Sequence, residues 1–283
     1  MSRIMLCRDQ PFSLDRTLSC GQAFRWDRFP DGSWTGTVGD QVIRCRQKGR
    51  VFSYSGTDEE FVTRYFSLDL DMGEILESID ADPFIHTAIE ECRGLRIVRQ
   101  PPWECLCSYI VATNSNIPTI RRRIAAIARH FGCRIGTAEC PSFSFPSPEG
   151  IFCREQSDLT ECMLGYRMPY VYISAGQAAS NPDWAETVAS LPYNEAQKEL
   201  MKFSGIGPKA ADCVLLFAFQ KFESFPVDVW IRRIMREQYL PGLPVDAPLT
   251  KKEYDAIRAF ADSHFGKYCG IAQEYLFAAR EGA

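Results

Sequence analysis

The sequence lacks several features that would assign it to a particular class of protein. Its 283 residues contain no apolar run of about 18 residues, the length that a membrane-spanning helix needs. The N-terminal stretch MSRIMLCRDQPF has no apolar segment of the kind found in signal peptides. Internal repeats and low-complexity tracts are absent too. We therefore expect a cytoplasmic globular protein.

Cysteine is abundant, but its spacing excludes the common cysteine frameworks. The chain has 12 cysteines and no CxxC pair, and a reducing cytoplasm argues against a disulfide scaffold. A zinc site is conceivable, but the spacing of its candidate ligands fits no standard zinc module. These candidates are His130, Cys133, Cys140, Cys153 and Cys162. We expect no metal ligands among them, and most of the cysteines should be buried thiols that pack as small apolar residues.

The sequence also lacks the net positive charge that is common in nucleic-acid-binding proteins. The formal net charge is −4 and the pI is about 5.6. One stretch, TIRRRIAAIARHFGCR (119–134), nevertheless carries five arginines and no acidic residue. It suits contact with phosphates, but by itself the pattern favours a solvated helix face.

The order of predicted elements indicates an α+β fold. Short β-like runs fill the first 56 residues, with Asp31-Gly32 and Lys48-Gly49 as hairpin turns. Helical patterns follow from about residue 58, and residues 137–156 are expected to form a loop or linker. We expect a small N-terminal antiparallel β-sheet domain with flanking helices and then two mostly helical subdomains. The predicted ranges are 1–93, 94–190 and 191–283.

The stretch FSGIGPKAADCV (203–214) raises a question about its lysine. Gly205 and Gly207 suit a tight hairpin with exposed backbone N–H groups, and Pro208 suits the first position of a helix. Such a hairpin between two helices can hold a phosphate without reading sequence. Lys209 then falls in the first helical turn, where the helix dipole disfavours a cation. The helix N-terminus and burial should both lower the pKa of this amine, which a nucleophile requires.

A second motif, FPVDVW (225–230), follows 19 residues after Lys209. Asp228 stands where a helix N-cap belongs, and capping explains it well by itself. A helix of about 11 residues and a short return loop would also bring it close to Lys209. An amine and a carboxylate beside a phosphate site suggest attack on a sugar carbon, with the lysine as nucleophile and the carboxylate stabilising an oxocarbenium-like centre.

These motifs together resemble the 8-oxoguanine DNA glycosylase family of helix-hairpin-helix repair enzymes. The resemblance also covers LSCGQAFRW (18–26), CSYIVATNSNI (107–117), LGYRMPYV (164–171) and GIAQEYLFAA (270–279). It implies a bifunctional enzyme that flips 8-oxoguanine out of duplex DNA, excises it through a Schiff base on Lys209 and nicks the strand by β-elimination. Asp228 would stabilise the positive charge that develops on the sugar.

The resemblance also implies roles for further residues. The Gly21 carbonyl would accept the N7–H that distinguishes 8-oxoguanine from guanine, and Gln273 would read the Watson–Crick edge. Cys213 and Phe277 would sandwich the ring. Asn114 would fill the space that the base leaves, Tyr166 would wedge beside it, and Arg167 would contact the unpaired cytosine. The residues expected at the DNA are Asn114, Tyr166, Arg167, Gly205, Gly207 and Trp230.

Two positions depart from the animal members of this family. Thr119 stands where they carry a second arginine that reads the opposite base. Threonine lacks the bidentate fork of arginine, so we expect a weaker preference for cytosine opposite the lesion. Trp230 replaces a histidine; it can pack there but cannot relay a proton.

Other functions remain open. A related glycosylase could act on adenine or on another oxidised base, but relatives of that kind commonly carry an iron–sulfur cluster. After residue 162 only Cys213 and Cys269 remain, too few for four ligands. A DNA-binding module without catalysis would not need Lys209 and Asp228. We expect a monomer that needs no cofactor for catalysis, although the hairpin carbonyls of Met201, Phe203 and Ile206 could hold a structural cation.

Overall fold

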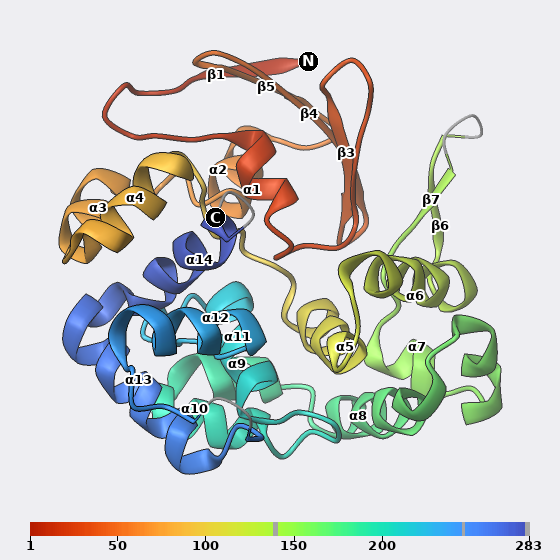
Figure 1. The fold of residues 1–283 in the computed structure, drawn as a ribbon. Helices are drawn as coiled ribbons and strands as arrows, with labels where there is room; N and C mark the ends of the chain where they lie inside the picture. Colours follow the sequence, from red (N-terminus) through yellow and green to blue (C-terminus); the bar gives the residue numbers. More distant parts are fainter. Residues whose placement is uncertain (138–140, 245–246, 281–283) are drawn as a thin grey trace.

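The structure is a computed structural model that describes residues 1–137, 141–244 and 247–280. A five-stranded antiparallel sheet at one end of the molecule is built by the first 55 residues (Figure 1). Its strand order is β1-β5-β4-β3-β2. The strands are β1 (Ser2–Met5), β2 (Trp26–Arg28), β3 (Trp34–Val38), β4 (Gln41–Lys48) and β5 (Val51–Ser55). The predicted N-terminal sheet is confirmed, including turns at Gly32 and Gly49 with φ of +77° and +55°.

An aromatic cluster packs under this sheet and holds the first helices against it. Phe52 from β5 and Trp26 from β2 are completely or almost completely buried, and both contact Phe66, which follows α2 (Glu59–Tyr65). The indole N–H of Trp26 donates to the hydroxyl of Tyr65 over 2.8 Å. This packing anchors the chain that runs from α1 (Leu14–Ser19) into β2.

The rest of the chain is mainly helical. The α-helices after α2 are α3 (Met72–Ile79), α4 (Pro83–Glu91), α5 (Pro102–Ala112), α6 (Ile117–Phe131), α7 (Pro148–Phe152), α8 (Met168–Ser180), α9 (Trp184–Ser190), α10 (Tyr193–Leu200), α11 (Pro208–Phe219), α12 (Val229–Ile234), α13 (Lys251–Phe265) and α14 (Cys269–Ala279). Short 3-10 segments cover Gln156–Cys162, Gly165–Arg167 and Gly266–Tyr268, and a π-helical turn covers Met235–Tyr239. None of the described helices is long and apolar enough to cross a membrane.

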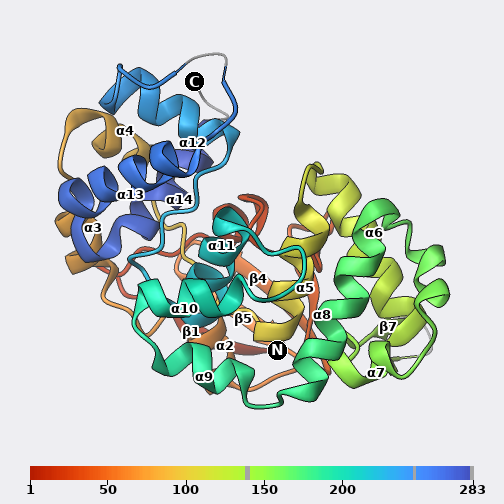
Figure 2. The ribbon, with the colours of Figure 1, turned by 90° about the horizontal axis from the view of Figure 1, so that it is seen from below.

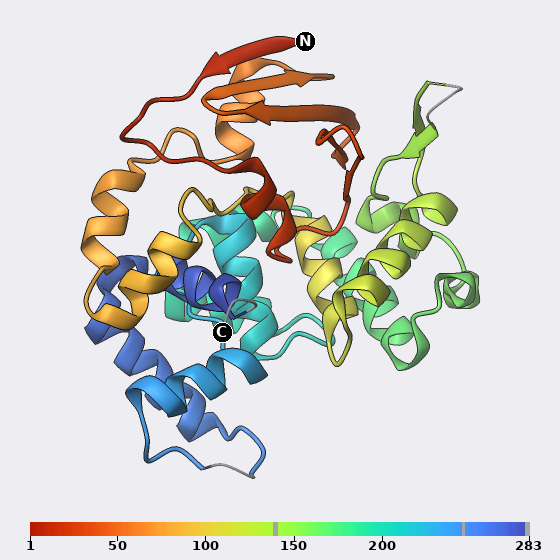
Figure 3. The ribbon, with the colours of Figure 1, turned by 45° about the horizontal axis from the view of Figure 1, so that its top comes forward.

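The helices form two groups on either side of a central pair, α11 and α5. Figure 2 shows α6, α7 and α8 on one side of this pair and α12, α13 and α14 on the other. Helices α3 and α4 lie beside the C-terminal helices (Figure 3), and α4 packs on α14. Their apolar residues share one core with the C-terminal helices. Core contacts therefore cross the predicted boundary at residue 93; the three domain ranges stay a prediction.

The segment 137–156 differs from the loop that the sequence suggests. Strands β6 (Arg134–Gly136) and β7 (Pro141–Phe143) pair as a hairpin, and α7 follows. Prolines misled the prediction because here they begin elements: Pro141 opens β7, and Pro148 takes the first position of α7, where its missing N–H costs nothing. Residues 138–140 lie outside the described part of the chain.

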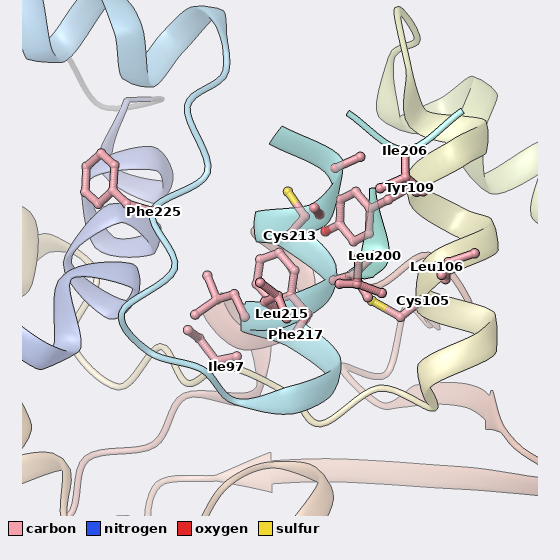
Figure 4. Close-up of a cluster of buried hydrophobic side chains, with 14 of the residues drawn as sticks. Ile97, Cys105, Leu106, Tyr109, Leu200, Ile206, Cys213, Leu215, Phe217 and Phe225 are labelled. Atoms are coloured by element: carbon pink, nitrogen blue, oxygen red, sulfur yellow. The ribbon is translucent and has the colours of Figure 1, made fainter. Parts of the chain in front are cut away.

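The buried contact between α5 and α11 determines where the hairpin before α11 lies. Tyr109 on α5 stacks on Phe217 of α11, with ring centroids 5.8 Å apart and planes 11° apart. Cys213, one turn before Phe217, lies beside the same tyrosine (Figure 4). The N-terminus of α11 is thereby held next to the chain that leaves α5.

Candidate active site

The hairpin between α10 and α11 presents an open helix N-terminus. Gly205 has φ of +82°, and a Cβ there would lie 2.9 Å from Tyr170, so the turn requires glycine. Gly207 is the N-cap of α11 in an extended conformation with no side-chain capping bond, and a Cβ added to it would have nothing within 4 Å. The fold does not demand glycine at 207. Because Gly207 has no side chain, the first N–H groups of α11 are accessible to an anion.

Lys209, in the first turn of α11, reaches into a cavity of about 140 Å³ between α5, α11 and α14. Its ammonium lies 5.2 Å from the centre of the Tyr109 ring. Six residues singled out from the sequence line this one cavity, although they are up to 256 positions apart (277 minus 21). They are Gly21, Lys209, Cys213, Asp228, Gln273 and Phe277.

The charge of Lys209 differs from the sequence-based expectation. Burial does lower the pKa of its amine, as predicted. Its interaction with Cys213, which includes a hydrogen bond, and the negative charges of Asp228 and Glu274 raise it, however, and the balance lies above the ordinary pKa of lysine. The prediction of a lowered pKa is therefore wrong for the protein without DNA, because sequence reasoning counted burial and the helix dipole but not the acidic groups around the amine. Lys209 is therefore an ammonium in this state, and an ammonium must lose a proton before it can act as a nucleophile.

Asp228 both caps a helix and lies at the cavity with Lys209, as the sequence allowed; its role in chemistry stays a prediction. Its Oδ1 accepts the backbone N–H groups of Trp230 and Ile231 over 3.0 and 2.8 Å, so it caps α12. The same half-buried carboxylate lines the cavity with Lys209. The cap therefore holds a negative charge in a set position beside the amine.

Gly21 lies on the loop that closes the cavity opposite α11, and its neighbour Gln22 anchors this loop. Gln22 is almost fully buried, and all the hydrogen-bonding groups of its side chain are used. Its amide donates to two backbone carbonyls and its oxygen accepts a backbone N–H, each over 2.8 Å; the three partners are Thr17, Arg96 and Val98. The backbone around Gly21 is thus held in one conformation.

Replacing Gly21 with alanine should harm both stability and activity. Gly21 has φ of +99°, and an added Cβ would lie 2.8 Å from Cδ1 of Ile117. We expect the free energy of unfolding to fall by about 1–3 kcal/mol and the activity to fall further, since the cavity wall must shift. Gly32→Ala is the matched control, because Gly32 also has a positive φ but has nothing within 4 Å. Denaturant unfolding and activity assays compare the two variants, and equal activity would contradict a role for Gly21 in the cavity.

Helix α14 supplies the far wall of the cavity. Gln273 and Phe277 lie one turn apart, and both line it. Among the described residues the Oε1 of Gln273 has no hydrogen-bond partner although it is buried. On α11, burial raises the pKa of the Cys213 thiol to about 12, so this group is a neutral thiol near pH 7. An apolar ring, a thiol and a free amide oxygen suit a flat polar ring such as a nucleobase.

Several known proteins resemble this chain in sequence and in structure. Residues 4–106 match the family model for the N-terminal domain of 8-oxoguanine DNA glycosylase. A probable N-glycosylase/DNA lyase of Methanothermobacter thermautotrophicus is 32% identical over 242 residues, which cover 78% of this chain and 74% of the relative. Clostridium acetobutylicum 8-oxoguanine glycosylase/lyase, solved with double-stranded DNA containing cytosine opposite 8-oxoguanine, superposes with a TM-score of 0.88 at 33% identity, covering 96% of this chain and 92% of that chain. The chain belongs to the 8-oxoguanine DNA glycosylase/lyase family.

The N-glycosylase/DNA lyase of Saccharomyces cerevisiae extends the likeness, with 27% identity over 95% of this chain and 83% of the relative. The resemblance stated from the motifs is confirmed, as are the α+β fold and the enzyme class, a DNA N-glycosylase with lyase activity. The roles of individual residues stay predictions.

A second group of predicted residues lies outside the cavity in this glycosylase/lyase. Asn114 adopts the left-handed conformation with φ of +49°, and its amide donates to the hydroxyl of Tyr166 over 3.3 Å. The Arg167 guanidinium lies 4.3 Å from the centre of the Tyr166 ring and donates to the carbonyls of Thr113 and Asn114. Arg167 is buried, so without DNA it holds the strained turn at Asn114. To contact an unpaired cytosine, the Arg167 side chain would either keep its bonds to the Thr113 and Asn114 carbonyls or break them.

Trp230 and the arginine-rich stretch lie elsewhere on the surface. Trp230 is 48% exposed and lines a separate groove with Phe84 and Arg233. Within the arginine-rich stretch, Arg121 pairs with an aspartate, Asp27, and Arg123 donates to a backbone carbonyl and a serine. Arg121 and Arg123 thus support the fold, and phosphate contact by this stretch stays a prediction. The exposed arginines of the stretch are Arg122, Arg129 and Arg134.

The metal predictions have separate outcomes. Among the described residues no group of three or more His, Cys, Asp or Glu side chains could hold a metal ion, and Cys140 lies outside that part of the chain. At the hairpin, the Phe203 carbonyl accepts the N–H of Ile206 over 3.2 Å. A structural cation bound to these carbonyls stays a prediction.

Sequence reasoning missed several residues of the cavity. Tyr109 and Phe24 form part of its wall, Gln22 anchors its loop, and Glu274 adds a buried carboxyl. Gln22 and Glu274 stand inside quoted motifs, beside Gly21 and Gln273. Both could have been identified from the sequence as polar residues within otherwise apolar segments, since a buried Gln or Glu requires a partner or a function.

Proposed function

We propose that this protein is a bifunctional 8-oxoguanine DNA glycosylase and lyase. One observation supports this most directly: Lys209 and Asp228 line the same cavity as Gly21, Gln273 and Phe277. A nucleophile, a charge stabiliser and a pocket for a flat polar ring thus share one site. A nucleobase could enter it only after leaving the helical stack, because its glycosidic carbon cannot be reached within the duplex.

The chemistry follows from the positions of the charged groups. The Lys209 nitrogen, once neutral, attacks C1′ while the bond from C1′ to the base breaks. Positive charge develops on the sugar, and the Asp228 carboxylate, held by its cap bonds, stabilises it. Loss of the sugar ring oxygen as a leaving group gives a Schiff base on Lys209. Removal of a proton from C2′ then allows β-elimination of the 3′-phosphate, which cleaves the strand.

The protein would bind double-stranded DNA through its backbone phosphates. The open N-terminus of α11 at Gly207 and the exposed Arg122 and Arg129 are groups of the right charge. We further propose that Asn114 and Tyr166 occupy the gap beside the flipped base, because their side chains are hydrogen-bonded to each other outside the cavity. Action as a monomer in the cytoplasm is part of the same proposal.

The experiment that tests this function uses duplexes with a single 8-oxoguanine opposite each of the four bases. Base release and strand cleavage are measured separately, and an undamaged duplex is the control. We expect both products from 8-oxoguanine and none from guanine. Release without cleavage would indicate a glycosylase that lacks the lyase step. Binding without either product would favour a DNA-binding module, and activity confined to another lesion would favour the related glycosylases.

Thr119 makes a prediction about the opposite base. It lies at the start of α6, where its N–H donates to the capping Asn116. Its short hydroxyl cannot form the two parallel hydrogen bonds of an arginine, so we expect similar rates opposite cytosine and opposite adenine. Thr119→Arg should raise the cytosine preference about tenfold. Thr119→Lys is the control, because a point charge should strengthen DNA binding for every opposite base; an equal preference in both variants would contradict the prediction.

A further inference from the structure

Glu274 is a buried carboxyl in the cavity that the chemistry above does not use. It lies on α14 between Gln273 and Tyr275, is 3% exposed and lines the same cavity as Lys209. Its Oε1 has no hydrogen-bond partner in the described part of the chain. A buried carboxyl oxygen without a donor is costly, so its presence here calls for a role in the cavity.

Charged and titratable groups surround this carboxyl from several elements. Burial raises the pKa of Glu274 to about 7, and the charge of Asp228 raises it too, whereas the Cys20 thiol, Arg280 and Lys209 act in the opposite direction. Cys92, after α4, and Tyr109, on α5, also interact with it electrostatically. Glu274 therefore changes charge near neutral pH, while the thiols and the tyrosine stay protonated there.

The ammonium of Lys209 needs a proton acceptor before it can attack a sugar. Asp228 uses Oδ1 to accept two backbone N–H groups, and a proton on this carboxyl would weaken the cap and remove the charge that the sugar requires. Cys213 and Tyr109 hold their own protons, because burial raises the pKa of both groups. Among the described residues that line the cavity, Glu274 is the carboxyl with a fully buried oxygen that has no hydrogen-bond partner.

We propose that Glu274 is the proton acceptor that converts Lys209 from the ammonium to the nucleophilic amine. This step rests on the proposed function. An N–H bond of the ammonium breaks and its proton moves to the Glu274 carboxylate, which becomes a carboxylic acid. The amine lone pair forms the bond to C1′ while the electron pair of the glycosidic bond leaves with the base. The acid then returns its proton to the departing base, so Glu274 ends as the carboxylate and the lysine nitrogen keeps a positive charge.

The test is the pH profile of base release in a single turnover, from about pH 5.5 to 9. In the wild type we expect the rate to rise through pH about 7, as Glu274 ionises. Glu274→Gln should lower the rate at neutral pH about 100-fold and move the rise to more alkaline pH, where Lys209 loses its proton unaided. Glu274→Asp should restore the rise near neutral pH. Glu77→Gln on α3, which removes an equal charge from an exposed site, should leave the profile unchanged.

The outcomes separate this proposal from a structural role and from the function itself. A lower rate in Glu274→Gln with an unchanged profile would indicate packing alone and overturn the proposal. A wild-type profile that is flat near neutral pH would overturn it without any variant, even if Glu274→Gln failed to fold. If the wild type releases no 8-oxoguanine at any pH, the proposed function fails and the role of Glu274 fails with it.

Discussion

Lys209→Gln is expected to abolish base release and strand cleavage and to eliminate the covalent adduct that borohydride traps with damaged DNA. Glutamine has nearly the length of lysine but no amine, so neither the bond to C1′ nor the Schiff base can form. The rate of base release should fall about 10⁴-fold or more, the scale on which loss of a nucleophile acts. Binding to DNA should persist, because the open N-terminus of α11 at Gly207 is unchanged.

The control for this variant is Lys202→Gln, on the same hairpin. Lys202 is exposed and pairs with Glu199 one turn back, away from the cavity. The Lys202→Gln variant should form the borohydride adduct like the wild type. If Lys209→Gln still forms the adduct, another amine of the protein is the nucleophile. If the wild type releases the base normally but forms no adduct, a water molecule attacks the sugar instead of the lysine.

Asp228→Asn should separate the two functions of this residue. Asparagine caps helices about as well as aspartate, so the unfolding free energy should change little. The negative charge beside the sugar is lost, however, and we expect base release to slow about 10²- to 10³-fold, as when a preorganised electrostatic group is removed from an active site. Single-turnover kinetics on 8-oxoguanine DNA and a thermal denaturation curve measure the two effects.

Asp228→Ala completes this comparison. It should lose the charge and also the two bonds to Trp230 and Ile231, with a further cost in stability of about 1 kcal/mol. If asparagine and alanine lower stability equally, the cap is not the reason for the position of Asp228. If Asp228→Asn keeps full activity, the carboxylate charge has no part in the chemistry.

The sequence predicted the local features of the site well, because each depends on neighbours along the chain. The hairpin before α11 follows from glycine and proline in fixed order, and the cap at Asp228 follows from an acidic residue at the start of an apolar helix. Gln273 and Phe277 are one turn apart, so any helix over this segment presents them together. The prolines of 137–156 were misread because proline both ends and begins elements, and only the neighbouring contacts distinguish the two uses.

Features that join distant segments could not be predicted in this way. The Arg167 guanidinium, which the sequence placed at the unpaired cytosine, is bound in the structure to the carbonyls of Thr113 and Asn114, which lie 53 or more positions away. Packing of α3 and α4 with the C-terminal helices likewise depends on apolar faces that could have met several partners. Apolar burial is non-directional, so a pattern identifies the buried face of a helix but not what covers it.

The sequence by itself determined the class of fold, the order of the elements and the pair of residues, Lys209 and Asp228, on which the proposed chemistry depends. Only the tertiary structure decided their electrostatic environment. It placed Cys213, Asp228 and Glu274 around one amine and so reversed the expected direction of the pKa shift of Lys209. Charges act through space over several ångströms, and in a folded chain the groups within that distance come from segments that are far apart in sequence.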